Sequence, residues 1–298
     1  MCEEVDVKKA MSRNDFFTNK SVEQISTILE QCEEGRIKKL DSNISDLFLQ
    51  DLTFLKHMTD YHQGAMHCLE EDNLRDGQLV KGLLEVITSE ERDNARHHKK
   101  EALNILLNLF KHSKSKELEL LLMENIDIML DNNNDLLEIE SPAILIVGLL
   151  SSASASKIQE AGAPEMEVLE ESVIVPGGGP EWEEKNQESL DAVKEELVVN
   201  KDILPKLKNV LMNHPNSEPC LNNMAVAVFS LVNNSPQYNS NILGCDILPT
   251  IAKQFAKKVT PDFHCLYDNM LDTLLQLSYQ NEADKTSLIG MGFSKGLV

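Results

Sequence analysis

The sequence predicts an all-α protein built from repeated helical units. Aromatic residues make up only 5% of the 298-residue chain, which disfavours a β-sandwich rich in aromatic and β-branched side chains. An apolar pattern typical of one buried helix face also recurs along the chain. A short amphipathic segment that stops at Gly or Asn follows each recurrence, as expected of a helical repeat.

The recurring pattern places apolar residues at positions i, i+3, i+4 and i+7 of a helix. It begins in "EALNILLNLF" and returns at intervals of about 40 residues, or about twice that, so we expect one divergent unit in the wide gap. Its four occurrences are Ala102, Ile105, Leu106 and Leu109; Pro142, Leu145, Ile146 and Leu149; Met224, Ala227, Val228 and Leu231; and Met270, Thr273, Leu274 and Leu277.

Each occurrence is followed by a polar turn and a predicted short helix: "SKELELLLMEN", "SASKIQEAG", "YNSNILGC" and "EADKTSLIGMG". These helices are expected to stop at Asn125, Gly162, Gly244 and Gly292, where a left-handed end is easiest. A second apolar helix comes next. In the divergent unit it covers residues 164–175, before the turn "PGGGP" at 176–180, the acidic helix "EWEEKNQESLDAVKEELVV" and the start of the next unit at "ILPKLKNVLMNHP".

A three-helix unit of this length and order resembles the armadillo repeat, over roughly residues 90–298. The resemblance is carried by "KKEALNILLNLFKHSKSKELELLLMENIDIML", "SPAILIVGLLSSASASKIQEAGAPEM" and "VLMNHPNSEPCLNNMAVAVFSLVNNSPQYNSNILGCDILPTIA". The last segment is the most complete match. The resemblance implies a right-handed α-solenoid.

The domain organisation follows from where the repeat is found. We expect a disordered tail at 1–14, an N-terminal helical cap or degenerate repeats at 15–90, and armadillo-like repeats at 91–298, with an acidic glycine-rich turn at 176–188. The final "LIGMGFSKGLV" stops where another helix would begin. A fragment, a splice form and a worn-down last unit are all compatible with that.

Composition narrows the classes of partner. Forty-nine acidic and 28 basic residues give a net charge of -21, which disfavours a nucleic-acid partner and favours a basic or polar polypeptide. The six cysteines form no CxxC pair, so no zinc or redox motif is predicted. No apolar run approaches the roughly 20 residues of a membrane helix, and no export signal is evident. We expect the protein in the cytosol and, as an alternative, also in the nucleus.

One segment has the residue types of a metal site. In "HMTDYHQGAMHC", Met58, His62 and Met66 would form one stripe on a helix and could hold a soft metal such as Cu(I). "MTDYHQGAM" also resembles the Met-x-x-His-His-x-x-Ala motif of a bacterial ferritin-like family, with Tyr61 in place of the first histidine. We favour the other interpretation, in which both methionines pack in a core and His62 reaches solvent or backbone.

No catalytic string is present, so an enzyme is not predicted and no cofactor or metal is expected. "PGGGP" lacks the Lys and Ser/Thr of a phosphate loop. We expect a non-catalytic scaffold or adaptor that binds a polypeptide on a concave solenoid surface. The alternatives are a helical-bundle metal-binding protein that uses Met58, His62 and Met66, or a nucleotide-exchange cofactor of a heat-shock ATPase, because that group also uses armadillo stacks.

The resemblance implies that the longest helix of each unit lines the groove. Importin-α-like members carry a Trp and Asn ladder there; Asn108 holds one Asn place, but Asn104 stands where the Trp would be, so nuclear-import adaptor function is disfavoured. Asn108 could bind a peptide backbone or a neighbouring helix end, and Trp182 could anchor a partner or cover its own solenoid. The predicted partner-binding residues are Asn104, Asn108, Lys111, Ser230, Asn233, Asp272, Gln276 and Tyr279.

Overall fold

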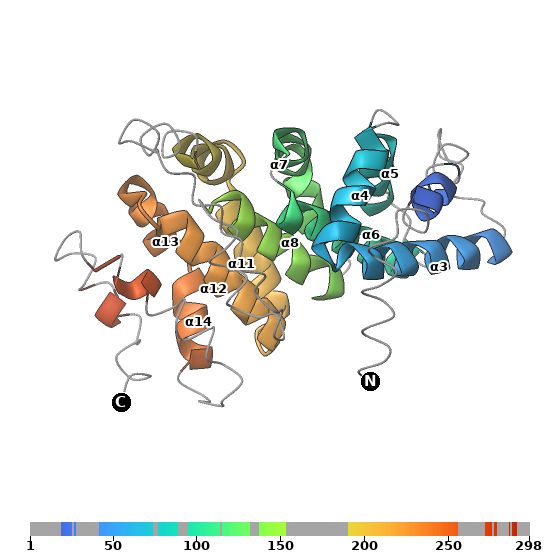
Figure 1. Ribbon diagram of the computed structural model, residues 1–298. Coiled ribbons are helices and arrows are strands. Elements are labelled where there is room, and N and C mark those ends of the chain that lie inside the picture. Colours follow the sequence, from blue (N-terminus) through green and yellow to red (C-terminus); the bar gives the residue numbers. More distant parts are fainter. Residues whose placement is uncertain are drawn as a thin grey trace, which may run out of the picture. The chain divides into compact units, whose positions relative to one another are not determined.

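All regular secondary structure in the described part of the chain is helical, as the sequence predicts (Figure 1). The computed structural model describes residues 19–25, 27, 42–73, 77–88, 95–113, 115–131, 137–152, 190–255, 272–275, 277–278, 286 and 288–290. The chain divides into two compact units, Met1–Pro142 and Ala143–Val298. The first unit therefore extends past the boundary predicted between residues 90 and 91.

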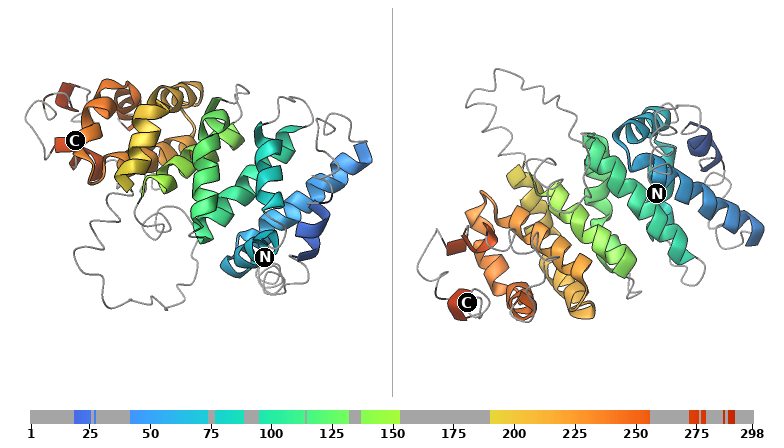
Figure 2. Two further views of the ribbon diagram at one scale, coloured as in Figure 1. Left: turned by 90° about the horizontal axis from the view of Figure 1, so that it is seen from above. Right: turned by 60° about the horizontal axis from the view of Figure 1, so that its bottom comes forward.

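The first unit is organised around α6 (Ala95–His112), which packs against α3, α4 and α5. Figures 1 and 2 show α3 lying alongside α6. A further contact joins α5 to α7. The other helices of this unit are α3 (Ser42–Thr59), α4 (His62–Asn73), α5 (Gln78–Thr88), α7 (Lys116–Asp131) and the first residues of α8 (Leu137–Leu150).

The predicted apolar face of α6 forms the centre of this core. Its four positions, Ala102, Ile105, Leu106 and Leu109, are all 0% exposed. Asp72, at the end of α4, caps the start of the neighbouring helix α5. Its carboxylate accepts hydrogen bonds from the backbone N–H groups of Leu79 (2.7 Å) and Val80 (3.3 Å) in the first turn of that helix.

The helix stop predicted at Asn125 is wrong, because α7 runs through it without a break. The Asn125 amide Nδ2 donates to the carbonyl of Leu121, one turn earlier, at 2.8 Å and so stays within the helix. Leu118, Leu122, Ile126 and Met129 are buried along one continuous face. The expected short helix and its successor are therefore a single element.

The second unit contains the remainder of α8 and helices that pack around α11 and α12. Residues 190–195 are helical and lead into the π-helix η2. Contacts join α11 to η2, α12 and α14, and α13 to α12 and α14. The bounds are η2 Glu196–Asn200, α11 Ile203–Asn213, α12 Glu218–Val232, η3 Pro236–Tyr238, α13 Asn239–Gly244 and α14 Ile247–Phe255.

The predicted buried face of α12 is confirmed: Met224, Ala227, Val228 and Leu231 are all 0% exposed. The Ser217 hydroxyl caps this helix by accepting from the Cys220 N–H at 3.4 Å. The predicted order of a short helix, a stop and another apolar helix is also confirmed in α13 and α14.

Gly244 ends α13 as predicted, but without a left-handed turn. The following residue, Cys245, is extended, with φ -90° and ψ 136°, and Gly244 is not among the residues with positive φ. Asn234, directly after α12, does adopt positive φ (56°), which Asn tolerates better than most residues.

The second and the fourth predicted sets of apolar positions are buried in part. In the second predicted set, Ile146 and Leu149 are buried and Pro142 and Leu145 half-buried; in the fourth, Thr273 and Leu277 are buried. The tail 1–14, residues 153–189 with Trp182, and Met270, Gln276, Tyr279 and Gly292 lie outside the described residues. Across the described helices, none combines the length and the apolar character needed to cross a membrane.

Candidate functional site

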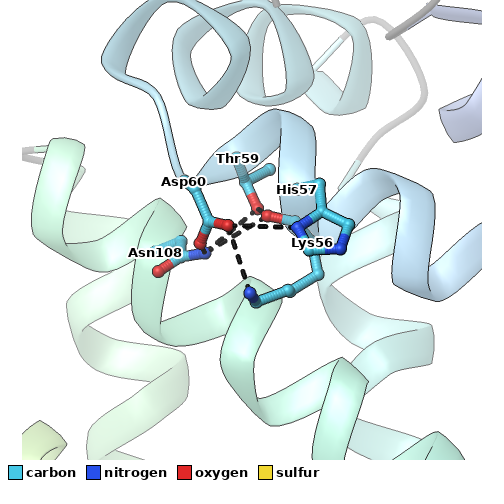
Figure 3. Close-up of polar contacts among 5 residues, drawn as sticks. All are labelled: Lys56, His57, Thr59, Asp60 and Asn108. Carbon is cyan, nitrogen blue, oxygen red and sulfur yellow. Dashed lines mark hydrogen bonds and ion pairs between the residues drawn. The ribbon is translucent and has the colours of Figure 1, made fainter. Parts of the chain in front are cut away.

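The stripe predicted on α6 holds Asn104, Asn108 and Lys111 on successive turns, and its middle member is buried. The Asn108 amide donates to Asp60 Oδ1 at 2.7 Å and makes longer contacts, both 3.4 Å, with the Lys56 carbonyl and Thr59 Oγ1 (Figure 3). Asn108 therefore bonds the end of the neighbouring helix α3, which is the second of its two expected roles. Asn104 and Lys111 are half-buried.

Asp60 lies in the turn between α3 and α4, and its carboxylate accepts hydrogen bonds from side chains of two helices (Figure 3). Besides Asn108, it accepts from Lys56 Nζ at 3.1 Å and lies 3.5 Å from His57 Nδ1. These basic residues stand in the last turn of α3, where the positive charge of Lys56 also complements the helix dipole. We call the surrounding group the Asp60 junction: Lys56, His57, Asp60, His62, Asn108, Lys111 and His112.

Two further basic residues of the junction, Lys111 and His112, close the last turn of α6. Burial lowers the pKa of Lys111; the charge of Asp60 opposes this shift and that of Lys56 adds to it. Burial and then the neighbouring His62 lower the pKa of His112, whose hydrogen bond to the Asp60 backbone acts in the opposite direction. The His62 and His112 rings meet edge to face, with centroids 5.6 Å apart.

The expected single stripe of Met58, His62 and Met66 is wrong, because the chain turns at Asp60 and Tyr61. Met58 belongs to α3 and is 1% exposed, whereas His62 is the exposed first residue of α4. Met66 is half-buried on α4. Over the described ranges, no group of three or more His, Cys, Asp or Glu side chains is arranged to hold a metal ion.

In the second unit, the predicted residues lie at the end of α12. Ser230 is buried, and Asn233, the C-cap, is half-buried. The Asn233 carbonyl accepts a 2.6 Å hydrogen bond from Lys194 Nζ. Asp272 is exposed, and Gln276 and Tyr279 fall outside the described residues.

Lys194 is the centre of a second polar group, which we call the Lys194 network: Asp191, Lys194, Asn233, Ser235 and Tyr238. Lys194 Nζ also lies 2.9 Å from Ser235 Oγ, which donates to Asp191 Oδ1 at 2.7 Å. The Tyr238 hydroxyl donates to the Asp191 carbonyl at 3.2 Å. The network ties the helix before η2 to the chain that leaves α12.

The Lys194 network has the atoms of a serine–lysine pair but is closed to substrate. Burial lowers the pKa of Lys194 to about 8, against the charge of Asp191. A lysine of lowered pKa beside a hydroxyl can act as a base in nucleophilic catalysis. Here Lys194 is 2% and Ser235 0% exposed, so no reacting group can reach the hydroxyl. The arrangement stabilises the fold.

Gly148 lies on α8, beside the second predicted set of apolar positions. A Cβ atom there would lie 3.1 Å from Val226 Cγ1 and 3.3 Å from the Ala227 backbone. The glycine thus allows α8 to approach α12 closely within the second unit. Helix packing, and not ligand binding, accounts for the small residue.

Sequence reasoning missed Asp60 and Lys194 as organising residues. Lys194 did have a signal: with Leu190 and Leu197 it follows the i, i+4, i+7 spacing of the core face, so its burial could have been predicted. The sequence contained no signal for the role of Asp60, because the residues that it bonds on α6 are remote in sequence.

No protein-family model matches this chain, and neither does any curated protein. The functional argument therefore depends on the residues and their geometry.

Proposed function

We propose that this chain is a non-catalytic, armadillo-like interaction module that binds a polypeptide partner along the long helices of its repeats. The observation that carries the proposal is the burial of the same four positions on α6 and on α12, each 0% exposed. Both helices are buried on more than this one face, so only their half-buried positions remain for contact with a partner.

The flank of α12 has the chemistry for such contact. Asn222, Asn223 and Phe229 are half-buried there. The Asn222 Oδ1 atom is buried and has no hydrogen-bond partner. Buried polar atoms are normally paired, but this oxygen is closed to a partner, so contact on this flank falls to the half-buried residues Asn223 and Phe229.

On α6, Asn104 and Lys111 offer comparable contacts. Asn104 is half-buried and lies one turn before Asn108, whose amide is already occupied by Asp60. A partner on this helix would therefore meet Asn104 and Lys111, and not Asn108.

Site-specific photo-crosslinking in native extract tests the proposal. A benzophenone side chain placed at Asn104 or at Asn223 is expected to capture the same discrete partner. Asn209, on α11, is the control because it is also a helical Asn and is more exposed than the other two, but it lies outside the predicted face. Capture with equal yield at all three positions, or at none, would contradict the proposal.

A further inference from the structure

The Asp60 junction concentrates basic side chains in an acidic protein. The chain has a net charge of -21, yet Lys56, His57, His62, Lys111 and His112 gather around one carboxylate. These five side chains come from the ends of three helices that pack together: the last turn of α3, the first residue of α4 and the last turn of α6.

The basic groups of this junction are poorly neutralised. Among the described residues, Asp60 is the only carboxylate that acts on the pKa of Lys111 or His112, whereas the charges of Lys56 and His62 oppose their protonation. The Asp60 carboxylate is already shared by Lys56, His57 and Asn108. The ammonium of Lys111 makes no ion pair with any described residue. Helix dipoles explain cations at the ends of α3 and α6, but not this excess.

The first turn of α4, which begins at His62 of the junction, adds unpaired donors. No oxygen of a described residue accepts from the backbone N–H groups of His62, Gln63 or Gly64. The first turn of α4 also contains no acidic residue. Backbone N–H groups at a helix start favour an anion, and here lysine and histidine side chains adjoin them.

We propose that the Asp60 junction is a docking site for an acidic segment of a polypeptide partner, with Lys111 as its main cationic contact and the imidazole of His112 as a neighbouring hydrogen-bond donor. This deepens the proposed function, on which it rests, by specifying the charge of the partner at α6. A partner selected by the net charge of the whole chain would be basic, whereas the local charge at this site selects an acidic one.

The side chains favour spaced carboxylates over a single phosphate. Phosphate sites commonly use arginine, whose guanidinium binds two oxygens at once. The junction contains lysine and histidine instead, which donate from single points and are distributed over three helix ends. Successive glutamate or aspartate side chains of an extended peptide fit such spacing.

A fluorescein-labelled octaglutamate peptide tests the site by fluorescence anisotropy on the full chain at low ionic strength. Because the whole chain repels this peptide, saturable binding requires a local basic site. Lys111→Gln is expected to weaken binding about fivefold, the effect of losing roughly one charge-assisted contact. Lys116→Gln is the matched control: it removes the same charge from an exposed lysine of the same unit and should change binding less than about twofold.

Two more variants separate binding from folding. Asp60→Asn removes the competing carboxylate but keeps an oxygen for Asn108, so it should strengthen binding about threefold. A damaged fold could not produce that gain. Asp46→Asn, at the exposed start of α3, is its control and should leave affinity unchanged. Lys111→Arg should restore binding.

Several results would overturn this inference. They are the absence of octaglutamate binding, equal losses from Lys111→Gln and Lys116→Gln, equal binding of uncharged octaglutamine, or displacement by inorganic phosphate at the same concentration as by unlabelled octaglutamate. The last would indicate a site for small anions. If the crosslinks at Asn104 and Asn223 persisted in these cases, the proposed function would stand and only the acidic partner would be excluded.

Discussion

The Asp60 junction and the Lys194 network use similar groups for different purposes. Each joins a lysine, a carboxylate and the end of a helix through short hydrogen bonds. In the Lys194 network the lysine and Ser235 are almost completely buried. In the Asp60 junction, Lys56 and Asp60 are 27% and 36% exposed, and basic groups outnumber the acid. Access and charge balance, not residue type, separate a structural cluster from one that can bind a partner.

The comparison also shows how each cluster responds to losing its acid. In the buried network, Asp191 is the only charge that favours the protonated form of Lys194. In the open junction, water and the mobile ends of long side chains can replace an ion pair. We therefore expect the same change to be costly at one place and tolerated at the other.

The largest effect is expected from Asp191→Ala. The variant leaves the buried Lys194 ammonium without its counter-charge and removes the acceptor of Ser235. We expect a loss of about 3 kcal/mol in the free energy of unfolding, measured by urea denaturation. The control is Glu195→Ala, which changes an exposed residue four positions later in the chain. It should change stability by less than about 0.5 kcal/mol. Equal losses would show that Lys194 does not depend on Asp191.

The second prediction concerns pH. Burial lowers the pKa of Lys194 from 10.5 to about 8, so above pH 8 the unfolded chain holds a proton that the folded chain has released. Stability from this group therefore rises with pH in that window. The unfolding free energy of the wild type minus that of Lys194→Met should increase by about 2 kcal/mol between pH 8 and pH 9.5. A difference that stays flat would mean that the Lys194 ammonium is solvated.

Asn108→Ala should have an intermediate effect, because it removes the link between α6 and the end of α3. Loss of the 2.7 Å bond to Asp60 and of the longer contacts should cost about 1–2 kcal/mol. Asn104→Ala, one turn earlier on the same helix, should cost less than about 0.5 kcal/mol. Thermal unfolding of both variants measures this, and equal losses would remove the structural role assigned to Asn108.

Helical periodicity predicted the apolar faces of α6 and α12 because burial repeats at the helix period, and the sequence shows that period directly. The stop at Asn125 failed for a related reason. Asn favours helix ends only when its side chain competes for backbone groups outside the helix, and here it bonds Leu121 within the helix.

The candidate site was less predictable than the fold. Met58 and Ala65 are both buried and lie seven residues apart, a spacing that suits one uninterrupted helix, so nothing local reveals the turn at Asp60. Asn108 was placed on a stripe predicted to meet a partner, but its hydrogen-bond acceptor Asp60 lies 48 positions away in sequence. Hydrogen bonds of that range depend on how helices pack, which periodicity does not specify.

Asp60→Asn makes the smallest change in stability and the sharpest comparison. The substitution retains an oxygen for the Asn108 amide and removes only a partly exposed ion pair with Lys56 and the contact with His57, so unfolding free energy should change by less than about 1 kcal/mol. Asp191→Asn is the same chemical change in the buried network, where Lys194 would lose its counter-charge. If urea denaturation gave equal losses for the two variants, the Asp60 junction would be a structural cluster like the other. A small loss at Asp60 with a large one at Asp191 is the result expected if the fold does not depend on the charges of the Asp60 junction.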